Sequence, residues 1–231
     1  IARTEVIPFA TQTLTDNEFL RGAAVGAVMI AGGLRLPQTT GERVPAVILL
    51  HGSGGYSAYI DAWVLRMNGW GIATFVVDSL SGRGLHKVAD DQGALGRLAG
   101  TLDAYRALET LSRHPLINAE RVTLLGFSRG GQGALYAAMS RFQDYYLQPG
   151  LQFCRFIALY PNCSTRYRED EQLVDRPVHI FHGALDDFNS VEPCERYVER
   201  LKATGTDVEL TVYPDAHHVF DWEGFAQAYS A

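Results

Sequence analysis

The sequence predicts an α/β fold, with one mostly parallel sheet of about eight strands, helices on both of its faces and no cap domain. Short apolar runs rich in Val, Ile and Leu, typical of strands covered on both faces, recur along the chain. Segments of helical period separate them, and this alternation is the pattern of parallel α/β sheets. Because 231 residues suit one such unit, we expect residues 1–231 to form a single domain.

The first two segments of the chain predict an antiparallel edge of this sheet. Residues 5–11 and 23–36 have the patterning of edge strands, and the polar stretch 13–17 is expected as a break between them. Residues 37–43 are expected to form a surface loop. The continuous apolar run 45–50 then predicts a strand that is buried on both faces.

Helices and strands alternate through the rest of the chain. Helices are predicted at 60–68, at 90–111, after Ser128 and from near Val191, and strands at 72–77, 122–125, 156–160, 178–181 and 208–213. No insertion between them is long enough for a cap domain, so we expect an open, shallow site. The loops that follow parallel strands meet at one edge of a sheet, and residues far apart in sequence are expected to come together there.

Residues 121–138 carry the clearest chemical signal. The apolar run ends in GFSRG (126–130), a G-x-S-x-G pentapeptide, and a helical segment rich in Gly and Ala follows it. A strand, a sharp turn and a helix in this order present the serine hydroxyl at the end of the sheet, while the glycines let strand and helix approach closely. We therefore predict that Ser128 is a nucleophile. The alternative is a small-residue turn that only packs a helix on a strand.

Two backbone amides are predicted to stabilise the oxyanion that forms when a serine attacks a carbonyl. One is the N–H of Arg129, because amides in the first turn of a helix lack partners and the helix dipole favours negative charge there. The other is the N–H of Ser53, with Gly54 as the alternative, in the small-residue loop after the strand at 45–50; a simple glycine-rich turn also remains open. Gly54 and Tyr56 are predicted to contact the substrate, and His51 to hold the loop rather than act as a base.

A serine nucleophile needs a histidine base and a carboxylate that orients it. Asp186, after a predicted strand, is the expected acid, with Asp187 as the alternative; the other of the two is expected to cap the next helix. His218, after the last strand, is the expected base, with His217 as the alternative, because adjacent side chains in an extended segment point in opposite directions. A metal site at these histidines is disfavoured for the same reason. We expect no metal and no other cofactor.

The charge of the chain disfavours several classes of partner. The net charge is −6 and no run of Lys or Arg occurs, so nucleic acid and anionic membrane surfaces are poor partners. The apolar stretch 22–33 is too short to span a bilayer. We therefore expect a small-molecule partner, and a protein that is a monomer or a homodimer.

Five motifs resemble the dienelactone hydrolase-like branch of the α/β-hydrolase superfamily. They are LLHGSGG (49–55), DSLSGRG (78–84), GFSRGG (126–131), GALDD (183–187) and YPDAHHVFD (213–221). The resemblance implies an α/β-hydrolase fold. It also places Ser128, Asp186 and His218 at the positions of the family's nucleophile, acid and histidine.

The chain departs from dienelactone hydrolases proper at two places. Those enzymes resemble it elsewhere but carry a cysteine where this chain has Ser128, and a glutamate in the loop that here reads His51-Gly52-Ser53. The resemblance therefore does not extend to a thiol nucleophile or to dienelactone as the substrate. The arginine-bearing loop is present, so the resemblance implies that Arg83 binds a substrate carboxylate. The alternative is a salt bridge or loop anchor at Arg83.

The chain has three cysteines, Cys154, Cys163 and Cys194. The resemblance implies a disulfide between Cys163 and Cys194. Such a bond would indicate an oxidising compartment, periplasmic or extracellular. Three reduced thiols in a cytosolic protein are the alternative.

These residues together predict a serine hydrolase that cleaves carboxylic esters of small substrates through an acyl-serine intermediate. One alternative is cleavage of thioesters or of amide and peptide bonds by the same residues. Another is a binding protein that keeps the fold without turnover. A complete Ser/Asp/His set argues against the last alternative, because a protein that only binds has no physical need for all three side chains.

Overall fold

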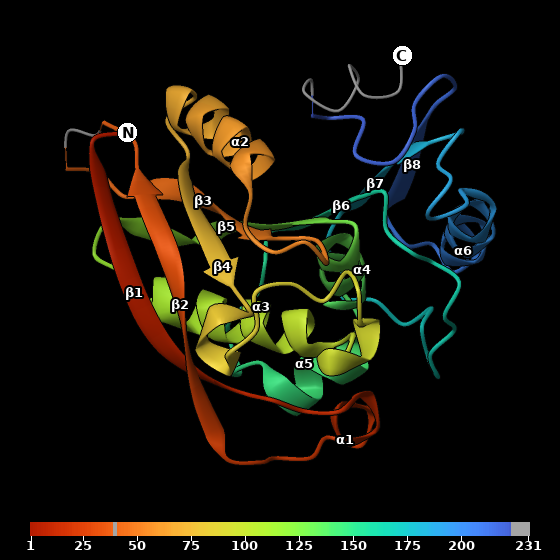
Figure 1. The fold of residues 1–231 in the computed structure, drawn as a ribbon, viewed down its shortest axis with the longest axis horizontal. Coiled ribbons are helices and arrows are strands. Elements are labelled where there is room, and N and C mark those ends of the chain that lie inside the picture. Colours follow the sequence, from red (N-terminus) through yellow and green to blue (C-terminus); the bar gives the residue numbers. More distant parts are fainter. Residues whose placement is uncertain (39–40, 223–231) are drawn as a thin grey trace.

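The apolar runs of the chain form one sheet with helices on both faces, in a computed structural model that describes residues 1–38 and 41–222 (Figure 1). The sheet has eight strands in the order β1-β2-β4-β3-β5-β6-β7-β8. Its strands are β1 (Arg3–Gln12), β2 (Ala27–Leu36), β3 (Val44–Leu50), β4 (Ala73–Asp78), β5 (Ile117–Phe127), β6 (Arg155–Leu159), β7 (Val178–Gly183) and β8 (Val208–Tyr213). β2 pairs antiparallel with β1 and β4, and all other neighbours are parallel. This is the predicted α/β-hydrolase fold.

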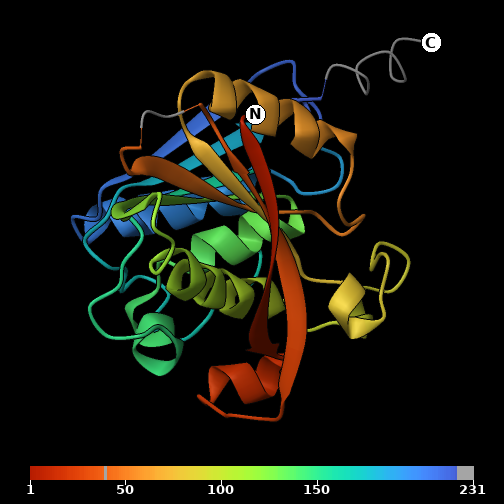
Figure 2. The ribbon, with the colours of Figure 1, turned by 90° about the vertical axis from the view of Figure 1, so that its left-hand side faces the viewer.

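Alternate side chains of the central strands enter two separate cores, because successive residues of a strand point to opposite faces. In β3, Ile48 and Leu50 belong to the larger core, and Val47 and Leu49 to the smaller one. The larger core includes residues of α3 (Ala99–Leu111), α4 (Arg129–Tyr136), α5 (Ser140–Tyr146) and α6 (Glu192–Ala203), and the smaller core includes residues of α2 (Ala58–Gly69). Figure 2 shows α2 on one side of the sheet and α3 on the other. Burial on both faces explains why these strands are apolar throughout.

The helix predicted at 90–111 is shorter than expected, because α3 begins only at Ala99. A short 3₁₀ turn, η2 (Gln92–Ala94), precedes it. The guanidinium of Arg129 donates hydrogen bonds to the carbonyl oxygens of Leu95 and Gly96. A continuous helix would use these oxygens for its own N–H groups, so the contact with Arg129 favours a loop here.

The polar stretch 13–17, expected as a break, instead contains the start of a short helix, α1 (Asp16–Leu20). Thr15 and Glu18 form a capping box: the Thr15 hydroxyl accepts from the N–H of Glu18, and the Glu18 carboxylate accepts from the N–H of Thr15. α5, which follows α4 closely, was also not predicted from the sequence.

Candidate active site

Ser128 lies in the turn between β5 and α4, with a backbone conformation that residues other than glycine rarely adopt. Its φ is 52° and its ψ is −113°. The turn requires small neighbours, because a Cβ on Gly126 would lie 1.9 Å from the carbonyl oxygen of Gly130. A Cβ on Gly130 would lie 2.3 Å from the carbonyl oxygen of Leu50 in β3. The G-x-S-x-G spacing thus brings strand, turn and helix into contact and presents the serine side chain at the end of the sheet.

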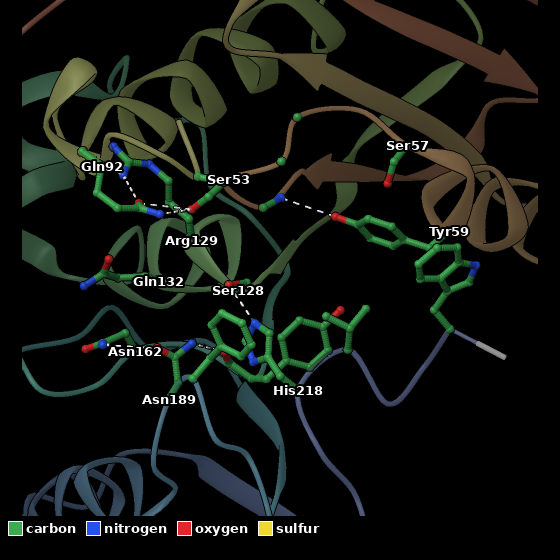
Figure 3. A pocket seen from close by; sticks show the side chains of 18 of the residues that line it. Ser53, Ser57, Tyr59, Gln92, Ser128, Arg129, Gln132, Asn162, Asn189 and His218 are labelled. Carbon is green, nitrogen blue, oxygen red and sulfur yellow. Dashed lines mark hydrogen bonds between the residues drawn. The ribbon is translucent and has the colours of Figure 1, made fainter. Parts of the chain in front are cut away.

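A continuous chain of hydrogen bonds joins Ser128, His218 and Asp186 (Figure 3 shows the first two residues). Nε2 of His218 lies 3.0 Å from the Oγ of Ser128, and Nδ1 lies 2.8 Å from Oδ2 of Asp186. The alternatives Asp187 and His217 do not take these positions, and Asp187 is exposed. Three residues that follow three different strands therefore meet at one edge of the sheet.

The carboxylate of Asp186 is fixed from both sides. Its Oδ1 accepts hydrogen bonds from the N–H groups of Phe188 and Asn189, at 3.0 and 2.8 Å, while Oδ2 faces His218. Burial alone raises the pKa of Asp186, but the hydrogen bonds from His218 and Asn189 outweigh it, so the pKa lies below its ordinary value. The carboxylate is held in its charged form.

The expectation that Asp187 would cap the next helix is wrong. α6 begins after Val191, and no side chain caps its first turn. Pro193 lies in that turn and has no N–H to satisfy, which reduces the need for a capping side chain.

Aromatic residues that the sequence analysis missed surround His218. The edge of the Tyr160 ring packs against the imidazole, with ring centres 4.7 Å apart, and the exposed Phe188 ring stacks on it at 5.2 Å. The Tyr160 hydroxyl donates to Asp221 at 2.7 Å, and the indole N–H of Trp63 donates to the same carboxylate at 2.6 Å. These contacts tie the loop that carries His218 to β6 and α2. No local motif marks them, because the partners are far apart in the sequence.

A cavity of about 500 Å³ opens beside Ser128. Ser53, Gly54 and Arg129 line it together with Ser128 and His218. Arg129 is the first residue of α4, so its N–H has no acceptor inside the helix. The residues predicted to supply the oxyanion donors therefore lie beside the serine, and Gly54 lies where the sequence predicts a substrate contact.

The loop after β3 is held in place by the buried side chain of His51 and the exposed side chain of Gln92. His51 is buried; its Nδ1 lies 2.8 Å from the carbonyl oxygen of Gly52, and its Nε2 accepts from the N–H of Ser79 at 3.3 Å. Burial lowers the pKa of His51 and favours the neutral ring that this pairing requires. On the other side of the loop, Gln92 bridges the Ser53 hydroxyl and the Arg129 guanidinium (Figure 3). His51 thus has the structural position that the sequence predicts.

Arg83 does not bind a substrate carboxylate, contrary to the prediction. Its guanidinium forms a two-point ion pair with Asp103 at 2.8 and 2.9 Å, and both side chains are almost fully buried, at 3% and 0% exposed. The remaining donors bind the hydroxyl of Thr13 and the carbonyl oxygens of Ser79 and Gln12. Every N–H of the guanidinium is occupied, so Arg83 anchors its loop, as the alternative interpretation held.

Tyr56 also differs from its predicted role. Its hydroxyl donates to Asp61 of α2 and accepts a hydrogen bond from Arg35 of β2, and the side chain is not among the residues that line the cavity. The neighbouring Tyr59 lines the cavity instead, and its hydroxyl accepts from the N–H of Gly52 (Figure 3).

Cys163 and Cys194 are joined by a disulfide, the pairing that the family resemblance implies, and Cys154 is a free thiol. The bond connects the segment after β6 to the first turn of α6.

Within residues 1–38 and 41–222, no cluster of three His, Cys, Asp or Glu side chains could hold a metal ion. In the same ranges, none of the helices has the length and apolar character needed to cross a bilayer.

Comparison with known proteins identifies the family. A family model described as the dienelactone hydrolase family matches residues 30–231. The chain belongs to the dienelactone hydrolase family.

Several solved structures share the fold of this family member. The dienelactone hydrolase-like promiscuous phosphotriesterase P91 from metagenomic libraries has a TM-score of 0.73 and 17% identity, covering 99% of this chain and 88% of that chain.

Two esterases of known structure are also similar in fold to this dienelactone hydrolase family member. Est1E from Butyrivibrio proteoclasticus has a TM-score of 0.61 and 15% identity, covering 96% of this chain and 95% of that chain. Esterase 2 from Thermogutta terrifontis has a TM-score of 0.66 and 17% identity, covering 95% and 89%. At these identities the likeness shows the fold alone.

Among curated proteins, this family member matches short segments of fungal non-reducing polyketide synthases. It is 39% identical over 59 residues to the synthase prhL of Penicillium brasilianum, and 44% identical over 45 residues to ausA of the same organism. Each match covers 2% of the synthase, so the chain spans a very small part of these relatives.

Proposed function

We propose that this family member is a serine hydrolase that cleaves carboxylic esters of small substrates. The observation that carries the proposal is the hydrogen-bonded chain from Ser128 through His218 to Asp186, with distances of 3.0 and 2.8 Å, beside a cavity of about 500 Å³. A serine hydroxyl is a weak nucleophile at neutral pH unless a base accepts its proton, and this chain supplies the base and the group that orients it.

In the first half-reaction, Nε2 of His218 accepts the Ser128 proton as Oγ attacks the ester carbonyl carbon. The charged carboxylate of Asp186 stabilises the imidazolium that forms. The N–H groups of Arg129 and Ser53 donate to the oxyanion of the tetrahedral intermediate. His218 then gives its proton to the leaving alkoxide as the C–O bond breaks, which leaves an acyl group on Ser128.

In the second half-reaction, water attacks the acyl carbon while His218 accepts one of its protons. Collapse of this second intermediate breaks the bond to Oγ, and the proton returns from His218 to Ser128. The products are one alcohol and one carboxylic acid, and the enzyme returns to its starting form without a cofactor. The volume of the cavity supports a small substrate. The Cys163–Cys194 disulfide supports an oxidising compartment for the folded chain.

The first test combines covalent labelling with turnover. Esterase 2 from Thermogutta terrifontis, which is similar in fold, is phosphonylated by cyclosarin, so a fluorophosphonate is a suitable probe. We expect a single adduct by intact mass and hydrolysis of p-nitrophenyl butanoate, both lost in Ser128→Ala. Ser57→Ala removes another serine hydroxyl from the same cavity and should keep the adduct. A folded wild-type protein with neither adduct nor turnover would contradict the proposal and favour a binding protein.

A further inference from the structure

Gln132 has a buried side-chain nitrogen without a hydrogen-bond partner. Nε2 makes no hydrogen bond to any of the described residues, and the whole residue is 1% exposed. Gln132 nevertheless lines the cavity beside Ser128. A buried polar group without a partner destabilises the folded state, so an unpaired amide at this place requires a physical reason.

The other amide side chains of the cavity are paired. Asn162 donates to Oδ1 of Asn189 at 3.2 Å and accepts from the N–H of Ser164 at 2.9 Å. Asn189 donates to the carbonyl oxygen of Tyr160 at 3.0 Å, and Gln92 bridges Ser53 in the loop after β3 and Arg129 in α4. These amides stabilise the cavity wall itself. Gln132 forms no such contact within the described part of the chain, so no protein group competes with a ligand for its amide.

The position of Gln132 relative to the nucleophile is fixed by the helix. Its backbone N–H donates to the carbonyl oxygen of Ser128 at 2.9 Å, so Gln132 lies just over one helical turn, about 6 Å along the helix axis, from Ser128. In Figure 3 the side chain of Gln132 extends toward the side of the cavity where Gln92 and Asn162 lie, away from Tyr59. A substrate whose ester carbon lies at Ser128 would therefore place a group a few bonds away near this amide.

The amide can present either of its polar atoms to that group. Rotation by 180° about its last bond exchanges the oxygen and the nitrogen, and because Nε2 has no partner the rotation breaks no hydrogen bond at that atom. A hydroxyl both donates and accepts, so it can pair with Gln132 in either orientation. We propose that Gln132 selects ester substrates that carry a hydroxyl group close to the attacked carbonyl. This inference rests on the proposed ester hydrolysis.

The test compares esters that differ only by a hydroxyl in place of a methyl group. On the acyl side the pair is p-nitrophenyl 3-hydroxybutanoate and p-nitrophenyl 3-methylbutanoate. On the alcohol side it is 2-hydroxyethyl butanoate and propyl butanoate. For each pair the measured quantity is the ratio of kcat/KM for the hydroxyl ester to that for the methyl ester, which cancels effects common to both substrates.

In one of the two pairs, we expect the ratio of the wild type to exceed that of Gln132→Leu by about three- to tenfold, the effect of one hydrogen bond between neutral groups. Gln143→Leu is the matched control. Gln143 is also a buried glutamine, but it donates to the carbonyl oxygen of Ala137 and does not line the cavity. It should keep the wild-type ratio. Should Gln132→Leu fail to fold, Gln132→Met offers an unbranched apolar side chain of similar length.

If Gln132 had a purely structural role, including one that binds a permanent water molecule, Gln132→Leu would change kcat/KM for both esters of a pair by the same factor. Equal ratios for the wild type and Gln132→Leu in both series would therefore overturn this inference while leaving ester hydrolysis intact. Failure of the wild type to hydrolyse any of the four esters, without a fluorophosphonate adduct, would instead overturn the proposed function.

Discussion

Asp186 positions His218, and the hydrogen bonds around Asp186 keep its carboxylate ionised. One oxygen faces His218, and the other accepts two backbone N–H groups from its own loop, so the carboxylate cannot rotate away. The fully buried ring of His182 also lies 3.8 Å from Oδ2. The pKa of Asp186 lies below its usual value of 3.8, because the hydrogen bonds of the folded state outweigh the opposing effect of burial. Asp186 is therefore charged throughout the neutral pH range.

Replacing Asp186 by Asn should lower kcat for p-nitrophenyl butanoate by about 10³- to 10⁴-fold, because an amide in this place favours the wrong tautomer of His218. Steady-state kinetics of the purified variant would measure the loss. Asp187→Asn changes the exposed neighbour in the same way and should remain within about twofold of the wild type, as is usual for surface substitutions without a special contact. Equal losses in the two variants would contradict the assignment of Asp186 as the acid.

Asp186 should also make stability depend on pH. Its pKa is lower in the folded than in the unfolded state, so its contribution is present above the unfolded value, near 4, and is lost as the pH falls through the folded value. The difference in free energy of unfolding between the wild type and Asp186→Asn should therefore shrink between pH 6 and pH 3. Urea unfolding at several pH values would measure it, and a difference that grows toward low pH would contradict the assigned direction.

At the scale of secondary-structure elements, the buried ion pair of Arg83 and Asp103 links three parts of the fold. Arg83 ends the short turn η1 (Ser81–Arg83) after β4, and Asp103 lies in α3. Thr11 in β1 donates to the same carboxylate at 2.7 Å. The pair therefore fixes the edge of the sheet against α3 and holds the turn that the sequence predicted as a substrate contact.

Removing one partner of this pair should destabilise the protein strongly. Arg83→Leu leaves the Asp103 carboxylate buried without its cation, and such losses are about 3–5 kcal/mol. The double variant Arg83→Leu/Asp103→Leu should recover a substantial part of that loss, because it leaves no uncompensated charge. Urea unfolding of the wild type, both single variants and the double variant would measure this. If the double variant lost as much free energy of unfolding as the two single variants together, the two residues would not act as a coupled pair.

Some helices, strands and residue roles can be predicted from sequence patterns, and others cannot. The apolar runs of the central strands β3, β4 and β5 were predicted because burial on both faces fixes their composition. The helix at 90–111 was predicted too long because its true start depends on the side chain of Arg129, which lies far along the chain. The predicted role of Arg83 was wrong for a similar reason: it depends on a residue far away in the sequence. An arginine at a strand end suits both ligand binding and loop anchoring, and only the buried Asp103 in α3 decides between them.

The disulfide links two further elements and should contribute to stability. It closes a loop with a sequence separation of 31 residues, for which the chain-entropy estimate is about 3–4 kcal/mol. Cys163→Ala/Cys194→Ala, or reduction of the wild type, should therefore lower the melting temperature by roughly 6–16 °C. Cys154→Ala, which removes the free thiol, is the control and should show no comparable loss. A double variant as stable as the wild type would show that the bond does not constrain the fold.

At the scale of the whole molecule, the sheet explains why three distant residues could be found from the sequence. The strands before Ser128, Asp186 and His218 are β5, β7 and β8, which are parallel and end at the same edge. A local motif at Ser128 and this topological rule indicate the two loops that carry the acid and the base. Asp187 and His217 remain alternatives at the level of the sequence, and the hydrogen bonds of His218 decide between them. The contacts of Tyr160 with Asp221 and the unpaired amide of Gln132 have no local signature, because each depends on packing between elements.

The distribution of charge also belongs to the whole molecule. The chain has a net charge of −6, yet the described residues that line the cavity include Arg97 and Arg129 and neither Asp nor Glu. The Arg129 guanidinium binds carbonyl oxygens and Gln92, and burial together with the charge of Arg97 lowers its pKa. Arg97 is exposed. A positive cavity in a negative protein should attract anionic substrates and repel cationic ones.

This charge should be visible as a preference between esters of opposite charge. We expect a higher kcat/KM for monoethyl glutarate than for ethyl 4-(trimethylammonio)butanoate, with the ratio reduced in Arg97→Glu. Salt should weaken the preference, because the screening length falls from about 30 Å at 0.01 M to about 3 Å at 1 M ionic strength. Arg166→Glu is the control: it changes the net charge equally at an exposed arginine outside the cavity lining. If both variants reduced the ratio equally, overall charge rather than Arg97 would govern the preference. A ratio that did not change with salt would exclude long-range electrostatics as its cause.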